Sequence, residues 1–403
     1  MDVKWCVISM LLVALSSGAA TAQEAVNPKH RKKAVQLFEE NDANKDGKLS
    51  RDEFPLRYRG RFDTIDTNSD GFLTLEEDIA YRASRLANKT RQQAAQPERS
   101  QQARPSNRTN RSRIPEGVTV ERDIVYARIG DRDLPLDIYI PNNAVRPMPV
   151  IIWVHGGGWK GGSKGGISRP VGVLSRGYAL VSVEYRLSGE AIWPAQIEDC
   201  KAAVRWTRAN AKAYGLDPDR IGAWGSSAGG HLVAMMGVAG DVEKFDTHRE
   251  YADTSARVQA VCDWFGPTDF TQMDAHRPKG ARLVHDDPDS PESRLVGGPI
   301  QKEPYFSICA DANPITYVTK DDPPILIMHG DRDMSVPVHQ SELLYQALEK
   351  VGVDATFYVV KGGGHGFRNA QSDSSENLSN RARDFFDRQF GMQPRQANGD
   401  GGE

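Results

Sequence analysis

The sequence has no excess of charge of one sign, because 51 Lys and Arg residues face 54 Asp and Glu residues and leave a formal net charge of −3. So balanced a chain gives no sign of general nucleic-acid binding. It also lacks a long hydrophobic run, since the apolar stretch WCVISMLLVAL near the N-terminus is too short to span a bilayer. These absences argue against a nucleic-acid-binding protein and against a membrane-spanning protein.

Cysteine is scarce, with 4 residues in 403. Cys6 lies in the N-terminal segment, which leaves Cys200, Cys262 and Cys309 in the rest of the chain. Three thiols allow at most one disulfide, and the spacing alone does not establish a Cys262–Cys309 bond. Cys200 lies on a helical stripe with apolar residues, which predicts that it packs in a core.

Motifs of catalytic metal and of phosphate binding are also missing. The sequence contains no H-E-x-x-H and no paired C-x-x-C, so no catalytic metal is predicted. The glycine-rich stretch GGSKGG at 161–166 is not followed by G-K-[ST] in the spacing of a phosphate loop. Chemistry in this chain is therefore expected to rest on its own side chains.

The N-terminus has the pattern of a secretory signal peptide. Lys4 precedes the apolar run, and the small residues Ala20 and Ala22 flank a predicted cleavage before Gln23. An uncleaved anchor is the alternative interpretation. We expect residues 1–22 to be removed and the protein to be secreted or periplasmic, with no membrane span after cleavage.

Residues 27–87 contain two similar acidic stretches, DANKDGKLSRDE and DTNSDGFLTLEE. Both match the EF-hand loop, in which oxygen ligands recur at alternate positions and a final Glu closes the site. The predicted ligands of a non-catalytic Ca²⁺ are Asp42, Asn44, Asp46, Lys48, Ser50 and Glu53 in the first loop and Asp66, Asn68, Asp70, Phe72, Thr74 and Glu77 in the second. The loops start close together, so one helix around FPLRYRGRF is expected to leave the first and enter the second. We predict a small all-α EF-hand pair.

Two further segments have little apolar content. Residues 88–113 are rich in polar residues and arginine and show no periodicity, which predicts a disordered linker. Residues 392–403 are expected to form a flexible tail. Neither segment is expected to contribute to a packed core.

From residue 114 to residue 391, apolar strand patterns alternate with helical patterns. VTVERDIVYARI and LPLDIYI flank Gly130-Asp131, which predicts a hairpin. Further strand patterns include PVIIWVHGG, RIGAWGSS and PPILIMHG, and helical stretches such as PAQIEDCKAAVRWTRANAKAYG lie between strands. This alternation predicts an α/β domain around a mostly parallel sheet, with its chemistry at the carboxyl ends of the strands.

The stretch GSSAG places Ser227 between a predicted strand and a predicted helix. G-x-S-x-G in that context is a nucleophile elbow, in which a strained turn presents a serine hydroxyl above the sheet. Ser226 has the same side chain, but the motif puts the nucleophile at its centre. Ser227 is the predicted nucleophile.

A serine nucleophile needs a base and a carboxylate that orients the base. His365 follows the last strand pattern in a glycine-rich loop and is the predicted base. Asp331 and Asp333 both follow ILIMHG, and Asp333 is the preferred acid because it precedes VP, while Asp331 is expected to brace the loop. The histidines expected to act as local caps or packing groups are His155, His231 and His329.

The stretch HGGGW at 155–159 ends an earlier strand pattern. Glycines let backbone N–H groups face a developing oxyanion without a Cβ in the way. We predict an oxyanion hole from the amides of Gly157, Gly158 and Ala228. Trp264, Tyr305 and Phe306, in a charged insertion at 241–313, are candidate pocket walls or core residues.

With these motifs, residues 114–391 resemble the α/β-hydrolase superfamily. HGGGW, SVEYRLS, GSSAGGHL, HGDRDMSVP and GGGHGF are similar to the hormone-sensitive-lipase-like carboxylesterases and to bacterial feruloyl and acetyl-xylan esterases. The resemblance implies an α/β-hydrolase fold and a serine esterase acting through Ser227, Asp333 and His365. It implies a small-molecule or carbohydrate-linked ester as substrate, possible acyl groups being acetyl and feruloyl.

Other functions remain open at this point. The same motifs occur in arylformamidases and in serine peptidases of the prolyl-oligopeptidase type. A calcium-dependent binding protein with an inactive hydrolase domain is the alternative from another class. The sequence indicates neither the oligomeric state nor the acyl and alcohol specificity.

Overall fold

The structure is a computed structural model that describes residues 28–54, 62–82, 114–248, 250–371 and 373–392. The chain divides into two compact units, Met1–Gln102 and Ala103–Glu403. The predicted signal peptide, the predicted linker at 88–113 and nearly all of the predicted tail lie outside the described residues. Within the described ranges, no helix is long and apolar enough to cross a membrane.

The first unit is small and is built around two short strands. Its named elements are α1 (Pro28–Asn41), β1 (Lys48–Ser50), α2 (Phe62–Ile65) and β2 (Phe72–Thr74). The strands pair antiparallel with Leu49 opposite Leu73, and both leucines are fully buried. The other buried members of this core are Leu37, Phe38, Phe54, Phe62 and Ile65. Most of the helix expected around FPLRYRGRF lies outside the described residues.

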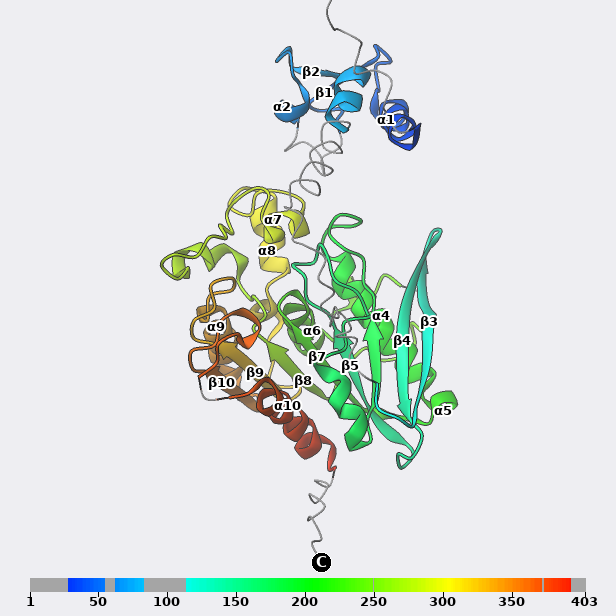
Figure 1. The fold of residues 1–403 in the computed structure, drawn as a ribbon, viewed down its shortest axis with the longest axis vertical. Coiled ribbons are helices and arrows are strands. Elements are labelled where there is room, and N and C mark those ends of the chain that lie inside the picture. The colour runs from blue at the N-terminus through cyan, green and yellow to red at the C-terminus, as the bar shows by residue number, and fades with distance from the viewer. Residues whose placement is uncertain (1–27, 55–61, 83–113, 249, 372, 393–403) are drawn as a thin grey trace, which may run out of the picture. The chain divides into compact units, whose positions relative to one another are not determined.

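The second unit contains an eight-stranded sheet with the order β10-β9-β8-β7-β5-β6-β4-β3 (Figure 1). Its strands are β3 (Val118–Ile129), β4 (Arg132–Pro141), β5 (Met148–Val154), β6 (Ala179–Val183), β7 (Leu216–Ser226), β8 (Ala260–Trp264), β9 (Ile325–Gly330) and β10 (Ala355–Val360). β3 and β4 form the predicted hairpin around Gly130-Asp131, and β4 pairs antiparallel with β6. The remaining pairs are parallel, as the alternating pattern predicts.

Helices cover both faces of this sheet. They are α4 (Ala195–Ala209), α5 (Ala211–Tyr214), α6 (Ala228–Val238), α7 (Pro291–Val296), α8 (Tyr305–Asp311), α9 (His339–Val351) and α10 (Ser375–Phe390). Short 3₁₀ helices join them: η2 (Pro170–Arg176), η3 (Glu243–Phe245), η4 (Phe270–Gln272), η5 (Asp274–His276), η6 (Pro314–Tyr317) and η7 (His365–Phe367). The inner strands β5, β6, β8 and β9 are thereby buried along their whole length, whereas the edge strand β3 is largely exposed.

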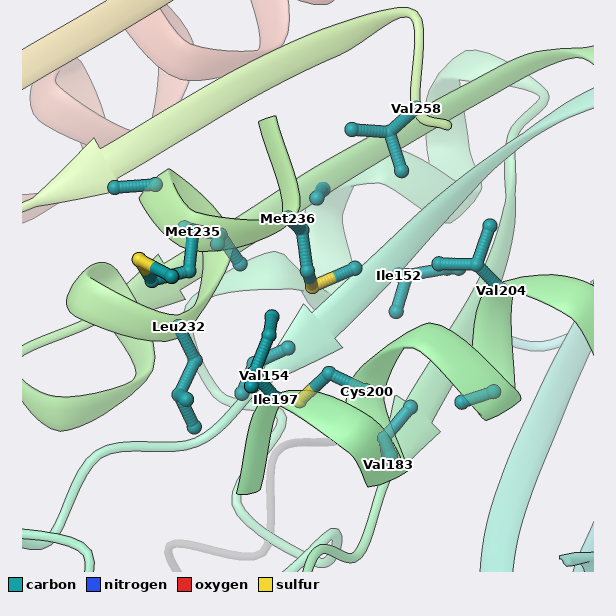
Figure 2. Packing of buried hydrophobic residues seen from close by; sticks show 14 of the residues in the cluster. Ile152, Val154, Val183, Ile197, Cys200, Val204, Leu232, Met235, Met236 and Val258 are labelled. Atoms are coloured by element: carbon teal, nitrogen blue, oxygen red, sulfur yellow. The ribbon is translucent and has the colours of Figure 1, made fainter. Parts of the chain in front are cut away.

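β5 shows how the sequence builds the two apolar layers. Successive side chains of a strand point to opposite faces, so a strand buried on both faces reads as a continuous apolar run. Ile152 and Val154 pack in the cluster that includes α4 and α6, beside Ile197 and Leu232 (Figure 2). Trp153, between them, packs in the second cluster with residues of η2 and α10.

The three described cysteines are free thiols, and all three are buried. Cys200 lies in α4 within the first apolar cluster, where the helical stripe predicts it. Burial raises the pKa of Cys200 and of Cys262 well above the ordinary value. These thiols are therefore packing groups, and the Cys262–Cys309 disulfide left open by the sequence is not formed.

Candidate active site

Ser227 lies between the end of β7 and the start of α6, and its backbone has φ 57° and ψ −124°. A non-glycine residue with positive φ is strained and needs its surroundings to hold it. The flanking glycines are required by close approach, since a Cβ on Gly225 would lie 2.2 Å from the carbonyl oxygen of Gly229. The Ser227 N–H donates to the carbonyl of Trp264 at 2.9 Å, which fixes the turn to β8. The local geometry is that of the predicted elbow.

The structure brings Ser227, His365 and Asp333 into one hydrogen-bonded chain. The Oγ of Ser227 is 3.1 Å from Nε2 of His365, and Nδ1 of His365 is 2.7 Å from Oδ2 of Asp333. The three residues follow three different strands, β7, β9 and β10, at their carboxyl ends. This is the order and spacing that a base between a nucleophile and an orienting carboxylate needs.

Asp333 is almost fully buried, and its two oxygens have separate partners. Oδ1 accepts the N–H groups of Ser335 and Val336 at 2.7 and 3.0 Å, and Oδ2 faces His365. Burial by itself raises the pKa of Asp333, but hydrogen bonds and charge interactions with His329 and His365 outweigh it and hold this pKa well below its ordinary value. Asp333 is therefore an ionised carboxylate aimed at the imidazole.

The rival acid, Asp331, faces away from the imidazole. Its Oδ1 accepts the N–H of Gly362 at 2.7 Å, which ties the loop after β9 to the loop after β10. This is the bracing contact that the sequence analysis expects of it. The geometry separates two carboxylates that stand two positions apart in the sequence.

A second histidine, His329, lies on the other side of Asp333. Its Nε2 donates to the carbonyl of Val336 at 3.0 Å and lies 3.5 Å from Oδ2 of Asp333, while Nδ1 forms a hydrogen bond with the Ser341 hydroxyl at 2.7 Å. These contacts make His329 a packing group that also shapes the acid loop. Its approach to Asp333 is not foreseen from the sequence, although the motif HGDRD places the two residues four positions apart.

The loop that carries His365 rests on aromatic rings. The ring of Phe265 packs edge-on against His365, with centroids 4.9 Å apart, and also against Phe367 at 4.8 Å. The Nη2 of Arg169 donates to the carbonyl of Gly366 at 3.3 Å. No sequence motif points to Phe265 or Arg169, because both reach the loop only through the fold.

The HGGGW loop packs directly on the elbow. A Cβ on Gly156 would lie 2.6 Å from the Ser226 carbonyl oxygen and 3.3 Å from Cβ of Ser227. Gly157 and Gly158 have φ 123° and 59°, and within the described ranges neither amide donates to a backbone oxygen. Ala228 is the first residue of α6, where helical N–H groups have no partner inside the helix. The N–H groups of Gly157, Gly158 and Ala228 thus have no backbone partner in the described part of the chain, and the HGGGW loop meets Ser227 at Gly156.

The other candidate residues serve packing. His155 stacks on Tyr185 at 4.4 Å, and Nε2 of His231 bonds the carbonyl of Ala312 at 2.7 Å. Burial lowers the pKa of His231 to about 4, which keeps it neutral. Trp264 is fully buried and belongs to the core, whereas Phe306 is 46% exposed. Of the aromatic wall candidates, the structure assigns Trp264 to the core.

The two acidic loops of the first unit have matching internal hydrogen bonds. The carboxylate of Asp42 accepts the N–H groups of Asp46 and Gly47, and that of Asp66 accepts those of Asp70 and Gly71. Gly47 and Gly71 have φ 78° and 83°, the conformation that the sharp turn of the motif needs. The duplicated turns and oxygen-rich side chains fit a hard cation such as Ca²⁺.

The closing glutamates of these loops point to their own backbone. Glu53 accepts the N–H and hydroxyl of Ser50, at 2.9 and 2.7 Å, and Glu77 accepts the N–H of Thr74 at 3.0 Å. The hydrogen bond from the Ser50 side chain is the main reason that the pKa of Glu53 is lowered. Across the described part of the chain, no three His, Cys, Asp or Glu side chains cluster closely enough to hold a metal ion.

Two family models match this chain. The BD-FAE model matches residues 136–348, which span β4 to α9 and include Ser227 and Asp333. The EF-hand model matches residues 34–54 and 59–77, the two acidic loops. The matches fall separately in the two compact units.

Curated relatives carry esterase names. Esterase LipC of Mycobacterium tuberculosis is 36% identical over 228 residues, which cover 55% of this chain and 54% of that protein. Esterase LipQ of the same organism is 32% identical over 299 residues, covering 72% of this chain and 68% of that protein. The chain thus spans about half the length of the first relative and two thirds of the second.

A solved structure described as a truncated form of a carbohydrate esterase from gut microbiota is 35% identical, with a TM-score of 0.58. The match covers 67% of this chain and 96% of that chain. Together with the mostly parallel sheet and its helices, it confirms the predicted α/β-hydrolase fold.

Proposed function

Because the chain belongs to the BD-FAE family, we propose that it is an exported serine hydrolase of carboxylic esters, with Ser227 as nucleophile, His365 as base and Asp333 as orienting acid. One observation carries the proposal. His365 bridges the Ser227 hydroxyl at 3.1 Å and the buried Asp333 carboxylate at 2.7 Å. The esterase names of the relatives support ester hydrolysis over the alternatives.

Acylation follows from the positions of the three side chains. The Oγ of Ser227 attacks the ester carbonyl while Nε2 of His365 takes the hydroxyl proton. Asp333 stabilises the imidazolium that forms, and the amides of Gly157, Gly158 and Ala228 bind the negative oxygen of the tetrahedral intermediate. His365 then gives its proton to the alcohol oxygen, the C–O bond breaks, and the alcohol leaves.

Deacylation repeats these steps with water. His365 takes a proton from water, the hydroxide attacks the acyl-enzyme carbonyl, and the proton returns to Ser227 as the acid departs. The strained turn with positive φ keeps Oγ of Ser227 in the same place in both half-reactions, first as the attacking hydroxyl and then as the ester oxygen of the acyl-enzyme. Acetyl and feruloyl esters of carbohydrates are the proposed substrates, and the carbohydrate esterase among the structural neighbours favours this class.

A covalent label tests the proposal independently of turnover. A fluorophosphonate should phosphonylate wild-type protein at one residue, identified as Ser227 by peptide mass spectrometry. Ser226→Ala should still be labelled, whereas Ser227→Ala should not. Labelling elsewhere, or no labelling of active protein, contradicts the assignment of Ser227.

Substrate panels separate the alternative functions. Hydrolysis of 4-nitrophenyl acetate with no cleavage of the matching anilide supports an esterase, whereas cleavage of peptide amides or of N-formyl anilines supports a peptidase or an arylformamidase. An inactive binding protein hydrolyses none of them.

We also propose that the two EF-hand loops bind Ca²⁺ through the oxygens of Asp42, Asp46 and Glu53 and their counterparts in the second loop.

A further inference from the structure

Three arginines contact the loop that carries His365, Arg169 through its side chain and Arg332 and Arg368 through their backbone. Arg169 donates through Nη2 to the carbonyl of Gly366, next to His365. The backbone N–H of Arg332 donates to the carbonyl of Gly363 at 3.0 Å, and the Arg368 carbonyl accepts the N–H of Gly364 at 2.7 Å. Each arginine therefore contacts a residue within two positions of His365.

None of these three guanidinium groups forms an ion pair with a carboxylate in the part of the chain that the structure describes. Other arginines of this unit do, since Arg176 pairs with Asp387 and Arg186 with Asp199. The Arg169 guanidinium therefore has no carboxylate partner among the described residues, because Asp333, the carboxylate beside His365, is paired with two histidines and accepts two backbone N–H groups.

Arg169 shows the cost of this arrangement most clearly. Its guanidinium lies over the rings of Trp264 and Phe265, at 5.1 and 5.9 Å, and is partly buried. Burial, with a smaller contribution from the charge of Arg368, lowers the pKa of Arg169. The Gly366 carbonyl accepts one N–H of this guanidinium but does not balance its positive charge. A partly desolvated cation with a second cation, Arg368, nearby is stabilised most by an anion that arrives with a ligand.

The reaction indicates which part of an ester meets these arginines. His365 must deliver its proton to the leaving alcohol oxygen, so the groups that flank His365 face the alcohol part. The acyl oxygen instead faces the HGGGW loop.

We propose that Arg169, with Arg332 and Arg368, binds an anionic oxygen group, a carboxylate or a sulfate, on the alcohol part of the ester. This proposal rests on the proposed function of the site. It makes the substrate an ester of an acidic alcohol, such as an acylated sugar that carries a carboxylate or a sulfate. Arg169 is the central contact because its planar guanidinium can bind an oxyanion through two N–H groups.

A matched pair of esters tests the proposal. 4-Acetoxybenzoate carries a carboxylate on its alcohol part, and methyl 4-acetoxybenzoate is neutral with the same acyl group. The measured quantity is the ratio of kcat/KM for the anionic ester to kcat/KM for the neutral one. Intrinsic reactivity cancels when this ratio is compared between variants. Arg169→Gln should lower it about tenfold or more, the range expected for a charge-assisted hydrogen bond.

The other arginines give graded expectations. Arg332→Gln and Arg368→Gln should lower the ratio about two- to threefold, because both side chains are exposed and screened. Arg388→Gln is the matched control. Arg388 is exposed and lies near the end of α10. Two positions further on, the carbonyl of Phe390 accepts a hydrogen bond from Arg220, which lies in the first half of β7. Because Ser227 follows the other end of β7, Arg388→Gln should leave the ratio unchanged.

Three outcomes separate the proposals. If wild-type protein hydrolyses neither ester, the proposed function fails. If it hydrolyses the neutral ester and Arg169→Gln leaves the ratio unchanged, the function stands and the anion site is refuted. If Arg169→Gln lowers kcat/KM only for 4-nitrophenyl hydrogen succinate, whose carboxylate lies on the acyl part, the assignment of the anion to the alcohol part of the ester is overturned. The ester 4-acetoxybenzenesulfonate shows whether the site prefers a sulfonate, as a mimic of sulfate, or a carboxylate.

Discussion

The two compact units hold aspartates in similar turns but in different surroundings. Asp42 in the first unit and Asp333 in the second each accept two backbone N–H groups from residues that follow in the chain. Asp42 shares its loop with the exposed Asp46. Asp333 is 1% exposed, and the carboxylate oxygen that accepts no backbone N–H, Oδ2, faces His365. The local turn therefore does not distinguish the two aspartates. Burial and the group opposite the second carboxylate oxygen do.

The largest effect is expected at Ser227. Ser227→Ala should lower turnover of 4-nitrophenyl acetate by a factor on the order of 10³ or more, because no hydroxyl remains to form the acyl-enzyme. KM should change far less than kcat. Near-wild-type turnover in this variant would mean that the elbow does not carry the nucleophile.

Asp333→Asn and Asp331→Asn test whether burial beside histidine is what matters. Asp333→Asn should lower kcat by about 10³-fold or more, because an amide no longer stabilises the imidazolium. Asp331→Asn keeps an oxygen to accept the Gly362 N–H and should cost less than about tenfold. The reverse ranking of the two kcat values would assign the acid to Asp331.

A smaller loss is expected at the oxyanion loop. Gly158→Val forces a β-branched residue to φ 59° and brings a Cβ to 3.3 Å from Cβ of Pro291, so the amide should turn away from the oxyanion. Turnover should fall about 10²–10³-fold, the loss expected for one oxyanion donor. Gly157→Val should be at least as harmful, because its Cβ would lie 2.2 Å from the Gly161 carbonyl oxygen. Unchanged kcat with native circular dichroism in both variants would remove these amides from the mechanism.

Short-range patterns predict the parts of this molecule that depend on neighbouring residues. The hairpin around Gly130-Asp131, the core position of Cys200 and the turn at Ser227 each follow from local spacing, and the structure has all three. The strand order cannot be predicted this way, because it depends on contacts between distant segments. Arg169 reaches Gly366 across 197 positions, so no local pattern reports that contact.

The choice between Asp331 and Asp333 shows a second limit of the sequence. Both residues follow the same strand, and the placement before VP favours Asp333 without measuring its distance to His365. Whether the Cys262–Cys309 disulfide forms depends in the same way on the relative positions of distant segments. The two EF-hand loops depend on local spacing instead, and Gly47 and Gly71 have the positive φ that the sharp turn of the motif needs.

A further buried carboxylate, Asp263 on β8, extends the comparison to pH. Burial raises the pKa of Asp263 to about 6, although the Gly266 N–H and His329 act in the opposite direction. Between about pH 4 and 6 this carboxyl keeps its proton in the folded state and loses it in the unfolded state, so its contribution to stability falls as pH rises through this window. The lowered pKa of His231 acts in the opposite direction over the same window, so the effect of Asp263 is measured as a difference from a variant. Asp333 titrates below this window because its pKa is lowered.

Asp263→Asn removes that titration. Relative to Asp263→Asn, wild type should lose roughly 2 kcal/mol of its free energy of unfolding between pH 4.5 and pH 7. Urea titrations at the two pH values, followed by tryptophan fluorescence, give the difference. Parallel pH dependence in the two proteins would show that Asp263 is ionised throughout.

The smallest effect on turnover is expected from calcium. The first unit has a small core around Leu49 and Leu73, so its stability should depend on a cation that binds only its folded form. At a cation concentration of a hundred times Kd, the free energy of unfolding should rise by about 2.7 kcal/mol, and the unfolding temperature should rise with it. Ser227, Asp333 and His365 all belong to the second unit, so turnover of a small ester should not need the metal. Glu53→Gln combined with Glu77→Gln should abolish the calcium-dependent shift, while Glu76→Gln, a neighbouring exposed glutamate outside the ligand set, should keep it. A chelator titration that follows thermal unfolding and ester hydrolysis together decides the question. Turnover that collapses with chelator and returns with calcium would show that calcium binding in the first unit is coupled to catalysis in the second.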